Sequence, residues 1–142
     1  MKVSEVMTRE VRTIGPDQTA KEAANFMLST DAGSIPVTDG ERLVGMITDR
    51  DIAVRGVAKG FAPDTPVSEL MTKDCITARE DDDVSTIASK MSEAQVRRLP
   101  VIDDQERLCG IVSLGDLSRD GDDQSASQAL AGVSQPGGQH RQ

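Results

Sequence analysis

Aromatic side chains are almost absent from this sequence of 142 residues, which has two Phe and neither Trp nor Tyr. The interior must therefore come from Val, Ile, Leu, Met and Ala, which suits helices packed on small sheets. With a single His, at position 140, a zinc site of Cys and His or a catalytic set that depends on His is not expected. Cys75 and Cys109 occupy strand-like apolar positions, and we interpret them as buried thiols rather than a disulfide or metal pair.

Long apolar runs and an excess of basic residues are missing too. The start MKVSEVM does not suit a signal peptide, and no later stretch approaches the ~20 apolar residues of a membrane span. We therefore expect a soluble, cytoplasmic protein without a membrane partner. The net charge of -8 disfavours nucleic-acid binding, which needs a dense basic surface. A few local Arg or Lys are still enough to hold a small anion.

The sequence contains an internal repeat. Three segments recur in the same order, and a single extra residue near Gln105 separates the second match from the third. A duplicated unit is the simplest explanation of such ordered matches. The matching pairs are VSEVMTREVRT (3–13) with VSELMTKDCIT (67–77), SIPVTD (34–39) with RLPVID (98–103), and ERLVGMITDRDI (41–52) with ERLCGIVSLGDL (106–117).

Each repeat is predicted to have the order β-α-β-β-α, preceded by a short turn capped by Ser4 or Ser68. The predicted strands are 11–14, 35–38 and 43–48, then 75–78, 99–102 and 108–113; the closing helices begin at Asp49, reaching about Lys59, and near Leu114. A polar stretch, 15–17 in one repeat and 80–83 in the other, precedes the first helix of each repeat. We interpret its apolar stripe as core: Ala20, Ala23, Ala24, Met27 and Leu28 in one repeat, and Val84, Ile87, Ala88 and Met91 in the other.

The predicted organisation is a first repeat at 1–60, a linker with two prolines at 61–66, a second repeat at 67–118 and a polar tail at 119–142. We expect the tail to be disordered, with a weak helix at 126–131 as the alternative. The fold class is α/β (α+β). Neither repeat has enough apolar residues to cover both faces of its sheet, so we expect the two pseudo-symmetric repeats to pack sheet to sheet around a shared core.

The same seven-residue pattern spans the junction between the last predicted strand and the closing helix of each repeat, at 45–51 and 110–116. It reads Gly, two apolar residues, Thr or Ser, two variable residues and Asp. A hydroxyl followed three residues later by a carboxylate is typical of a helix N-terminus, capped here by Thr48 or Ser113. Such a terminus also offers backbone N–H groups to an anion, and a carboxylate one turn in suits a ribose diol. The residues alone leave the structural cap and the ligand site both open.

These motifs resemble the cystathionine β-synthase (CBS) domain family, and their pairing resembles a Bateman module. The resemblance spans Met1 to about Ser118 and rests on an early Met-Thr, a Leu/Ile-Pro-Val strand ending in Asp, and the Gly-x-x-Thr/Ser-x-x-Asp pattern, each present twice. With TDRDIAVRGVAKG (48–60), the chain is similar to small stand-alone bacterial proteins with two CBS domains. The resemblance implies that AMP, ADP, ATP, NAD or S-adenosylmethionine binds in clefts between paired repeats, and that two modules form a homodimer.

In that family the Thr or Ser hydroxyl lies near the phosphate, the Asp binds the ribose, and residues just before the Pro-Val strand line the base pocket. The resemblance therefore implies two clefts. One would use Thr48 and Asp51 with Val96, Arg97, Arg98 and Leu99, and the other Ser113 and Asp116 with Ala32, Gly33, Ser34 and Ile35; Met46 and Ile111 would contact the base.

The two clefts are not expected to be equal. Arg50, Arg97 and Arg98 gather cations at the first cleft only, and an Arg can bind a phosphate through two hydrogen bonds. We therefore predict tighter binding in the first cleft. The alternative for these arginines is a solvated surface or ion pairs with the many carboxylates. Arg55 and Lys59 are expected to face solvent.

The leading hypothesis is a regulatory module that binds an adenine nucleotide, with AMP as the first candidate and with no obligatory cofactor. Because no effector domain is recognisable, its output would pass to a separate, unknown partner. The alternative is a ligand-independent scaffold for dimerisation or docking. An enzyme ranks third, because no acid and base pair, nucleophile or metal set can be placed by spacing. Nucleic-acid binding ranks last.

Overall fold

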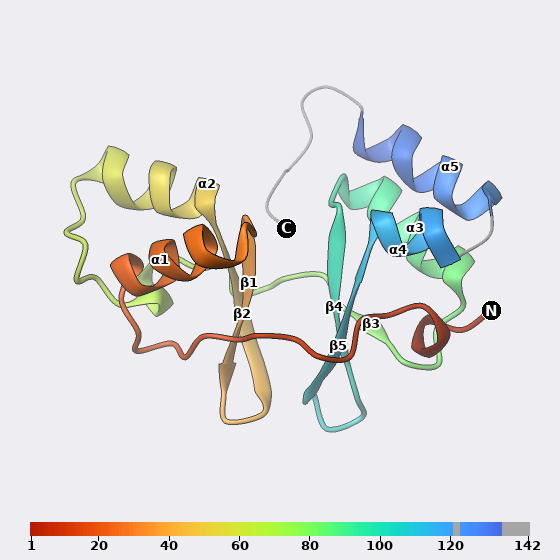
Figure 1. Ribbon diagram of the computed structural model, residues 1–142, viewed down its shortest axis with the longest axis horizontal. Coiled ribbons are helices and arrows are strands. Elements are labelled where there is room, and N and C mark those ends of the chain that lie inside the picture. Colours follow the sequence, from red (N-terminus) through yellow and green to blue (C-terminus); the bar gives the residue numbers. More distant parts are fainter. Residues whose placement is uncertain (121–122, 135–142) are drawn as a thin grey trace. The chain divides into compact units, whose positions relative to one another are not determined.

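The computed structural model describes residues 1–120 and 123–134, which form a mixed α/β structure with helices and two small sheets (Figure 1). The helices are α1 (Ala20–Thr30), α2 (Asp49–Asp51), α3 (Val84–Ala94), α4 (Leu114–Asp120) and α5 (Asp123–Val133). The strands are β1 (Ser34–Asp39), β2 (Arg42–Thr48), β3 (Ala78–Arg79), β4 (Arg98–Ile102) and β5 (Leu108–Ser113). Helix α2 continues as a π-helical turn (Ile52–Gly56) and a 3-10 turn (Val57–Lys59); further 3-10 turns lie at Val3–Glu5 and Val67–Glu69.

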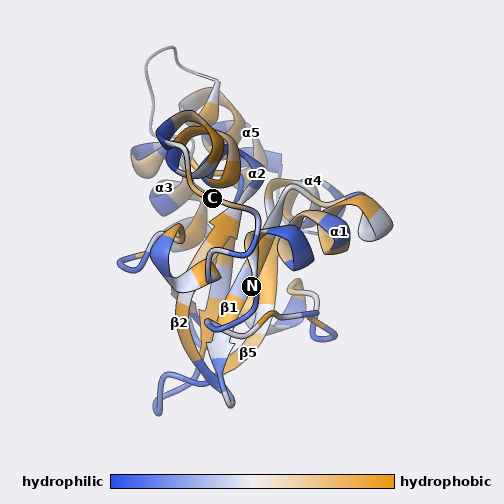
Figure 2. Ribbon diagram, turned by 90° about the vertical axis from the view of Figure 1, so that its left-hand side faces the viewer, coloured by the Kyte–Doolittle hydropathy of each residue, from blue (hydrophilic) through white to orange (hydrophobic). Residues whose placement is uncertain are grey.

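The two hairpins confirm the strand predictions at 35–38, 43–48, 99–102 and 108–113. Strand β1 pairs antiparallel with β2, and β4 with β5, and Figure 2 shows hydrophobic colour along strands and on parts of the helices. Gly40 adopts φ +65° in the first hairpin turn, where a side chain would be strained. The opening strand of each repeat is shorter than predicted. Ile14 forms a single parallel bridge with Val37, and β3 is a two-residue strand parallel to β4.

The apolar stripe of α3 is buried as predicted, but the stripe of α1 is only partly so. Ala20, Ala23 and Met27 are buried, whereas Ala24 is exposed and Leu28 is 82% exposed. The prediction that Leu28 is a core residue is therefore wrong. The helical spacing correctly grouped these residues into one broad stripe along α1, but only part of that stripe faces the sheet.

The described chain divides into two compact units. The first unit comprises residues 12–75, and the second unit comprises 1–11 together with 76–120 and 123–134. These divisions do not coincide with the sequence repeats. The opening turn of the first repeat belongs to the second unit, and the opening turn of the second repeat, at Val67–Glu69, belongs to the first unit.

Backbone pairing explains this exchange. Thr72 and Met46 exchange two hydrogen bonds of 2.8 and 3.0 Å, which attach the segment after Val67–Glu69 to the outer side of β2. Thr8 and Ile111 make the equivalent pair, at 2.8 and 2.9 Å, in the second unit. Each repeated Met-Thr motif is thus bonded to the Gly-containing strand of the other repeat.

The exchanged turns also complete the two cores. The core of the first unit includes Val67, Leu70 and Met71, while that of the second unit includes Val3, Val6 and Met7. Each unit therefore has a core of its own, where the sequence predicted one core shared by both repeats. The predicted caps are wrong as well, because Ser4 and Ser68 lie inside their 3-10 turns rather than before them.

The polar tail was expected to be disordered from residue 119, which is wrong for its described part. Helix α5 packs against α3 and α4, and its Ala129 and Val133 are buried in the core of the second unit. Gln95 Nε2 donates to the carbonyl of Gly132 at 3.2 Å, and Gly132 lies too close to Ser92 to carry a Cβ. The prediction for residues 135–142 falls outside the described residues.

Candidate functional site

In the first unit, the repeated motif forms a reciprocal cap where β2 meets α2. Thr48 Oγ1 accepts a hydrogen bond from the Asp51 amide at 3.0 Å, and the Thr48 amide donates to Asp51 Oδ2 at 3.0 Å. Both residues are 5% exposed. This geometry confirms the structural interpretation of the motif, since two otherwise unpaired amides are satisfied together.

The second unit repeats the arrangement between β5 and α4. Asp116 donates its amide to Ser113 Oγ at 3.1 Å and accepts from the Ser113 amide at 2.8 Å. Its other oxygen, Oδ1, accepts from the Arg119 guanidinium at 2.8 Å. Both oxygens of this carboxylate are therefore bonded within the chain.

The amides at the start of α2 are not free for an anion, contrary to expectation. The Asp49 amide donates to the Gly33 carbonyl at 3.0 Å, and the Arg50 amide donates to Asp49 Oδ1 at 2.8 Å. The Asp51 amide is bonded to Thr48 within the cap. A phosphate bound here would have to be held by side chains instead.

Two buried hydroxyls lie beside the last residues of β2. Ser34 opens β1 directly opposite Thr48 in the antiparallel register, and Thr72 pairs with Met46 on the other side of the strand. Ser34 Oγ and Thr72 Oγ1 are, within the described part of the chain, the buried side-chain oxygens that have no hydrogen-bond partner. Since buried hydroxyls are normally bonded, each of these two is a candidate to bond an additional polar group.

Sequence reasoning identified Ser34 as a site residue but missed Thr72. The available signal was the repeated Met-Thr motif, which contributed only to the family resemblance. The counterparts of the two hydroxyl-bearing residues in the second unit are Arg98 and Thr8, which is exposed. The unpartnered hydroxyls are therefore a feature of the first unit and not of the duplication.

The register also determines which predicted residues meet within each unit. Ser34 lies opposite Thr48, and Arg98 lies opposite Ser113. Gly33 leaves room for the Asp49 carboxylate, which would lie 3.0 Å from a Cβ at that position. The prediction that Thr48 and Asp51 share a ligand with residues 96–99 of the other repeat stays a prediction.

Several predicted base-pocket residues are buried in the cores. Ile35 belongs to the core of the first unit, and Val96 and Leu99 belong to that of the second. Met46 is fully buried, while Ile111 and Ala32 are half-buried. Core packing therefore accounts for the apolar character of these positions, and their contact with a base stays a prediction.

The predicted phosphate-binding arginines are accessible. Arg50 and Arg97 are exposed and Arg98 is half-buried, and none of the three forms an ion pair with a described residue. The prediction that Arg55 faces solvent is wrong. It is half-buried, its Nη1 donates to the Met71 carbonyl at 3.1 Å, and its Nε lies 3.9 Å from Asp51 Oδ1.

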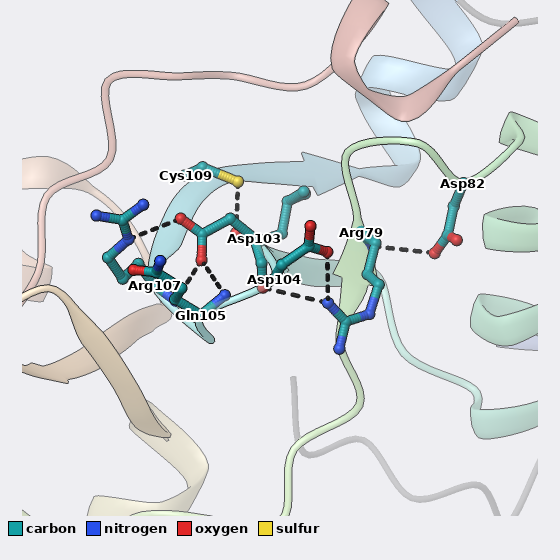
Figure 3. Close-up of polar contacts among 8 residues, drawn as sticks. Arg79, Asp82, Asp103, Asp104, Gln105, Arg107 and Cys109 are labelled. Carbon is teal, nitrogen blue, oxygen red and sulfur yellow. Dashed lines mark hydrogen bonds and ion pairs between the residues drawn. The ribbon is translucent and has the colours of Figure 1, made fainter.

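The β4–β5 hairpin carries a polar cluster, shown in Figure 3. Asp103 Oδ1 accepts from the amides of Gln105 and Arg107 at 2.9 Å each, and Oδ2 accepts from Arg107 Nε at 2.8 Å. The Arg107 amide, with these other donors, lowers the pKa of Asp103. Burial, together with Glu80, raises the pKa of the nearby Cys109 thiol to about 12. This cluster stabilises a turn and places no reactive group.

Both cysteines are free and half-buried rather than fully buried. Across residues 1–120 and 123–134 no group of three or more His, Cys, Asp or Glu side chains could hold a metal ion. Among the same residues, no helix has the length and apolar character needed to cross a membrane.

Two tandem repeats, each with a hairpin followed by a helix that the Thr/Ser-x-x-Asp motif caps, define a duplicated-domain architecture. The family model described as CBS domain matches residues 3–56 and 67–121, and the chain belongs to this family. The chain is 41% identical to the CBS domain-containing protein YhcV of Bacillus subtilis (strain 168) over 93% of this chain and 94% of that protein.

Solved structures of CBS domain pairs share the fold. The CBS domain pair of protein MJ0100, in complex with 5'-methylthioadenosine and S-adenosyl-L-methionine, is 33% identical with a TM-score of 0.74, covering 84% of this chain and 94% of that one. CBSX2 in complex with AMP is 25% identical with a TM-score of 0.74, covering 83% and 93% of the two chains. Both relatives were therefore solved with adenosyl compounds.

Proposed function

We propose that this protein is a regulatory module that binds an adenosyl compound, with AMP as the leading ligand, and acts on a separate partner chain. The observation that carries the proposal is the pair of unpartnered buried hydroxyls, Ser34 Oγ and Thr72 Oγ1, beside the Thr48/Asp51 motif. The adenosyl ligands of MJ0100 and CBSX2 support the choice of ligand class.

The chemistry of the first-unit residues suits the parts of a nucleotide. Asp51 supplies carboxylate oxygens, the acceptors that a ribose diol needs. Arg50 is exposed and carries a fork of N–H donors that matches phosphate oxygens. Because the amides of α2 are already bonded, the arginines rather than the helix terminus would carry the phosphate interaction.

The two motifs are proposed to differ in affinity, with the Thr48/Asp51 motif binding more tightly. Arg119 bonds Asp116 Oδ1 at 2.8 Å, and the exposed Arg50 of the first motif corresponds to Gly115 in the second, so the second motif lacks that cation. A ribose hydroxyl must displace a close guanidinium in the second unit. Ligand binding would alter the output only through different affinities for two states of the module or of its homodimer.

The test is thermal unfolding and calorimetric titration with AMP, ATP, NAD and S-adenosylmethionine. A ligand present at a hundred times its Kd should stabilise the protein by about 2.7 kcal/mol. Asp51→Ala should abolish the response, while the matched Asp116→Ala should keep it. Each change removes the carboxylate that accepts from the Thr48 or Ser113 amide and leaves that amide unpaired, at a cost of about 1–3 kcal/mol, so their unliganded stabilities serve as mutual controls.

A scaffold that docks or dimerises without a small ligand is the second candidate, favoured by the reciprocal caps that engage both motifs. No response of the wild-type protein to any of the four compounds at millimolar concentration would support the scaffold instead. Ser34→Ala separates the two further. If the Ser34 hydroxyl bonds the ligand, Ser34→Ala should weaken AMP binding. An unchanged affinity would mean that AMP binds elsewhere on the surface, which would favour the scaffold.

A further inference from the structure

Arg55 connects the Asp51 carboxylate to residues 67–72, which contain the opening turn of the second repeat and which we call the opening segment. Arg55 Nη1 donates to the carbonyls of Leu70 and Met71, at 3.4 and 3.1 Å. Its Nε lies 3.9 Å from Asp51 Oδ1. One guanidinium therefore contacts both the carboxylate of the repeated motif and the backbone of a segment that is distant in the sequence.

The contacts of Arg55 are partly shielded from water. The side chain of Asp51 is 6% exposed and that of Arg55 is 34% exposed. Opposite charges attract more strongly when one of them is buried, and a hydrogen bond from a charged donor is stronger than one between neutral groups. The buried carboxylate therefore holds the guanidinium in the position from which it bonds the two carbonyls.

The helix that carries Arg55 is irregular at this residue. Residues Ile52–Gly56 form a π-helical turn, in which the Val57 amide donates to the Ile52 carbonyl. A π turn contains more residues than an α turn, so Arg55 does not come to lie directly above Asp51. Single π turns are rare and occur frequently at functional sites. Here the turn lets the guanidinium reach the opening segment while it stays close to the carboxylate.

The opening segment ends in a group that suits a ligand. Thr72 Oγ1 is one of the two buried hydroxyls of the described chain that have no hydrogen-bond partner. The Thr72 amide and carbonyl are bonded to Met46 of β2. Because Arg55 bonds the carbonyl of the preceding residue, Met71, it helps to fix the Thr72 hydroxyl relative to the Asp51 carboxylate.

The second repeat has an acidic residue at the position of Arg55. When the third repeat match is continued by three residues, Arg55 corresponds to Asp120, whose carboxylate cannot donate to a carbonyl. Helix α4 is a regular α-helix over Leu114–Asp120, and Arg119 bonds Asp116 at 2.8 Å. The connection through Arg55 is therefore a property of the first unit rather than of the duplicated fold.

We propose that Arg55 is a positioning residue that couples the Asp51 carboxylate to the opening segment, so that a ligand bound at Asp51 makes this segment more rigid. A ligand that covers the carboxylate and the guanidinium excludes water, and their attraction becomes stronger. By linkage, a more rigid opening segment raises the affinity for the ligand in turn. The coupling exists in the unliganded chain, whereas its use by a ligand rests on the proposed function.

The first test uses the protein without nucleotide and measures amide hydrogen exchange by NMR at Met71 and Thr72, relative to the amides of β4 and β5. Asp51→Asn keeps the shape of the side chain and removes its charge, and it should speed this exchange by about two- to fivefold. Arg55→Met keeps an apolar stem and removes the donors, and it should have a similar effect. In the double variant, Asp51→Asn should add no further increase, because its effect passes through Arg55.

Lys59→Ala is the matched control for the loss of a cation. Lys59 is exposed on the same helical segment, and its replacement should leave the exchange at Met71 and Thr72 unchanged. Two outcomes would overturn the proposal. One is an Asp51→Asn effect of the same size with and without Arg55, and the other is a Lys59→Ala effect as large as that of Arg55→Met.

The second test repeats the measurement with saturating AMP. AMP should slow the exchange at Met71 and Thr72 in the wild type and leave it unchanged in Arg55→Met. Equal slowing in both proteins, or AMP binding to the wild type without slowing, would show that the ligand does not act through Arg55. A wild type that fails to bind AMP would overturn the proposed function instead, and the unliganded variants would still decide the coupling.

Discussion

Gly45 lies directly against Met71 and Thr72. A Cβ built on Gly45 would come within 2.8 Å of both Met71 Sδ and the Thr72 carbonyl oxygen. Gly110 is placed in the same way against Met7 and Thr8, at 2.8 and 2.9 Å. The glycine of each repeated motif is thus the residue that lets the opening turn of the other repeat pair with the strand.

Gly45→Ala is therefore expected to destabilise the protein by about 1–3 kcal/mol, because the Thr72 carbonyl belongs to a paired backbone and cannot turn aside. Urea unfolding followed by circular dichroism measures the change. Gly115→Ala is the matched control. Its Cβ would meet only Ser113 Oγ at 3.6 Å within α4, so it should be neutral or stabilise by up to about 1 kcal/mol.

Because the opening turns are exchanged, a substitution in the opening turn of one repeat is expected to destabilise the hairpin of the other repeat. Val3 and Val67 are equivalent and fully buried. Replacing either with Ala should cost about 1–3 kcal/mol through lost burial and a cavity. By hydrogen exchange, Val67→Ala should speed exchange in β1 and β2, and Val3→Ala in β4 and β5. The opposite assignment would show that each opening turn packs with its own repeat.

The pH dependence of the β4–β5 turn follows from Asp103. Its pKa is lowered from 3.8, first by the Arg107 amide, so its ionised form is bound more strongly in the folded state. The stabilisation is present above the ordinary pKa and is lost as the pH falls through the lowered one. Asp103→Asn should reduce the unfolding midpoint at pH 7, with the difference from wild type shrinking in acid; a constant difference would assign the effect to turn geometry alone.

Arg119 is expected to restrain the Ser113/Asp116 motif. The side chain of Arg119 is 68% exposed, so Arg119→Ala should change stability by no more than about 1 kcal/mol. Since it frees Asp116 Oδ1, it should strengthen AMP binding at the weaker motif by up to about fivefold. Titration calorimetry would then detect a second binding event; a stoichiometry unchanged from wild type would mean that Arg119 is not what limits this motif.

The candidate site was only partly predictable. Thr48 and Asp51 could be found because a hydroxyl three residues before a carboxylate is a local pattern with a known geometry. The missing partner of the Ser34 hydroxyl could not be found, since it depends on which atoms surround a buried side chain. The bonded amides of α2 escaped prediction for the same reason, because Gly33 reaches Asp49 only through the register of β1 and β2.

The sequence by itself determined the duplication, the hairpins, the caps at Thr48 and Ser113 and membership of the CBS family, because periodicity, turn residues and short motifs act over neighbouring positions. Tertiary structure decided which opening turn packs with which hairpin, and why Leu28 is exposed while Ser92 is covered by α5. Those outcomes depend on backbone pairing and helix packing between segments far apart in the chain. Identical spacing in two repeats cannot distinguish packing within a repeat from an exchange between them.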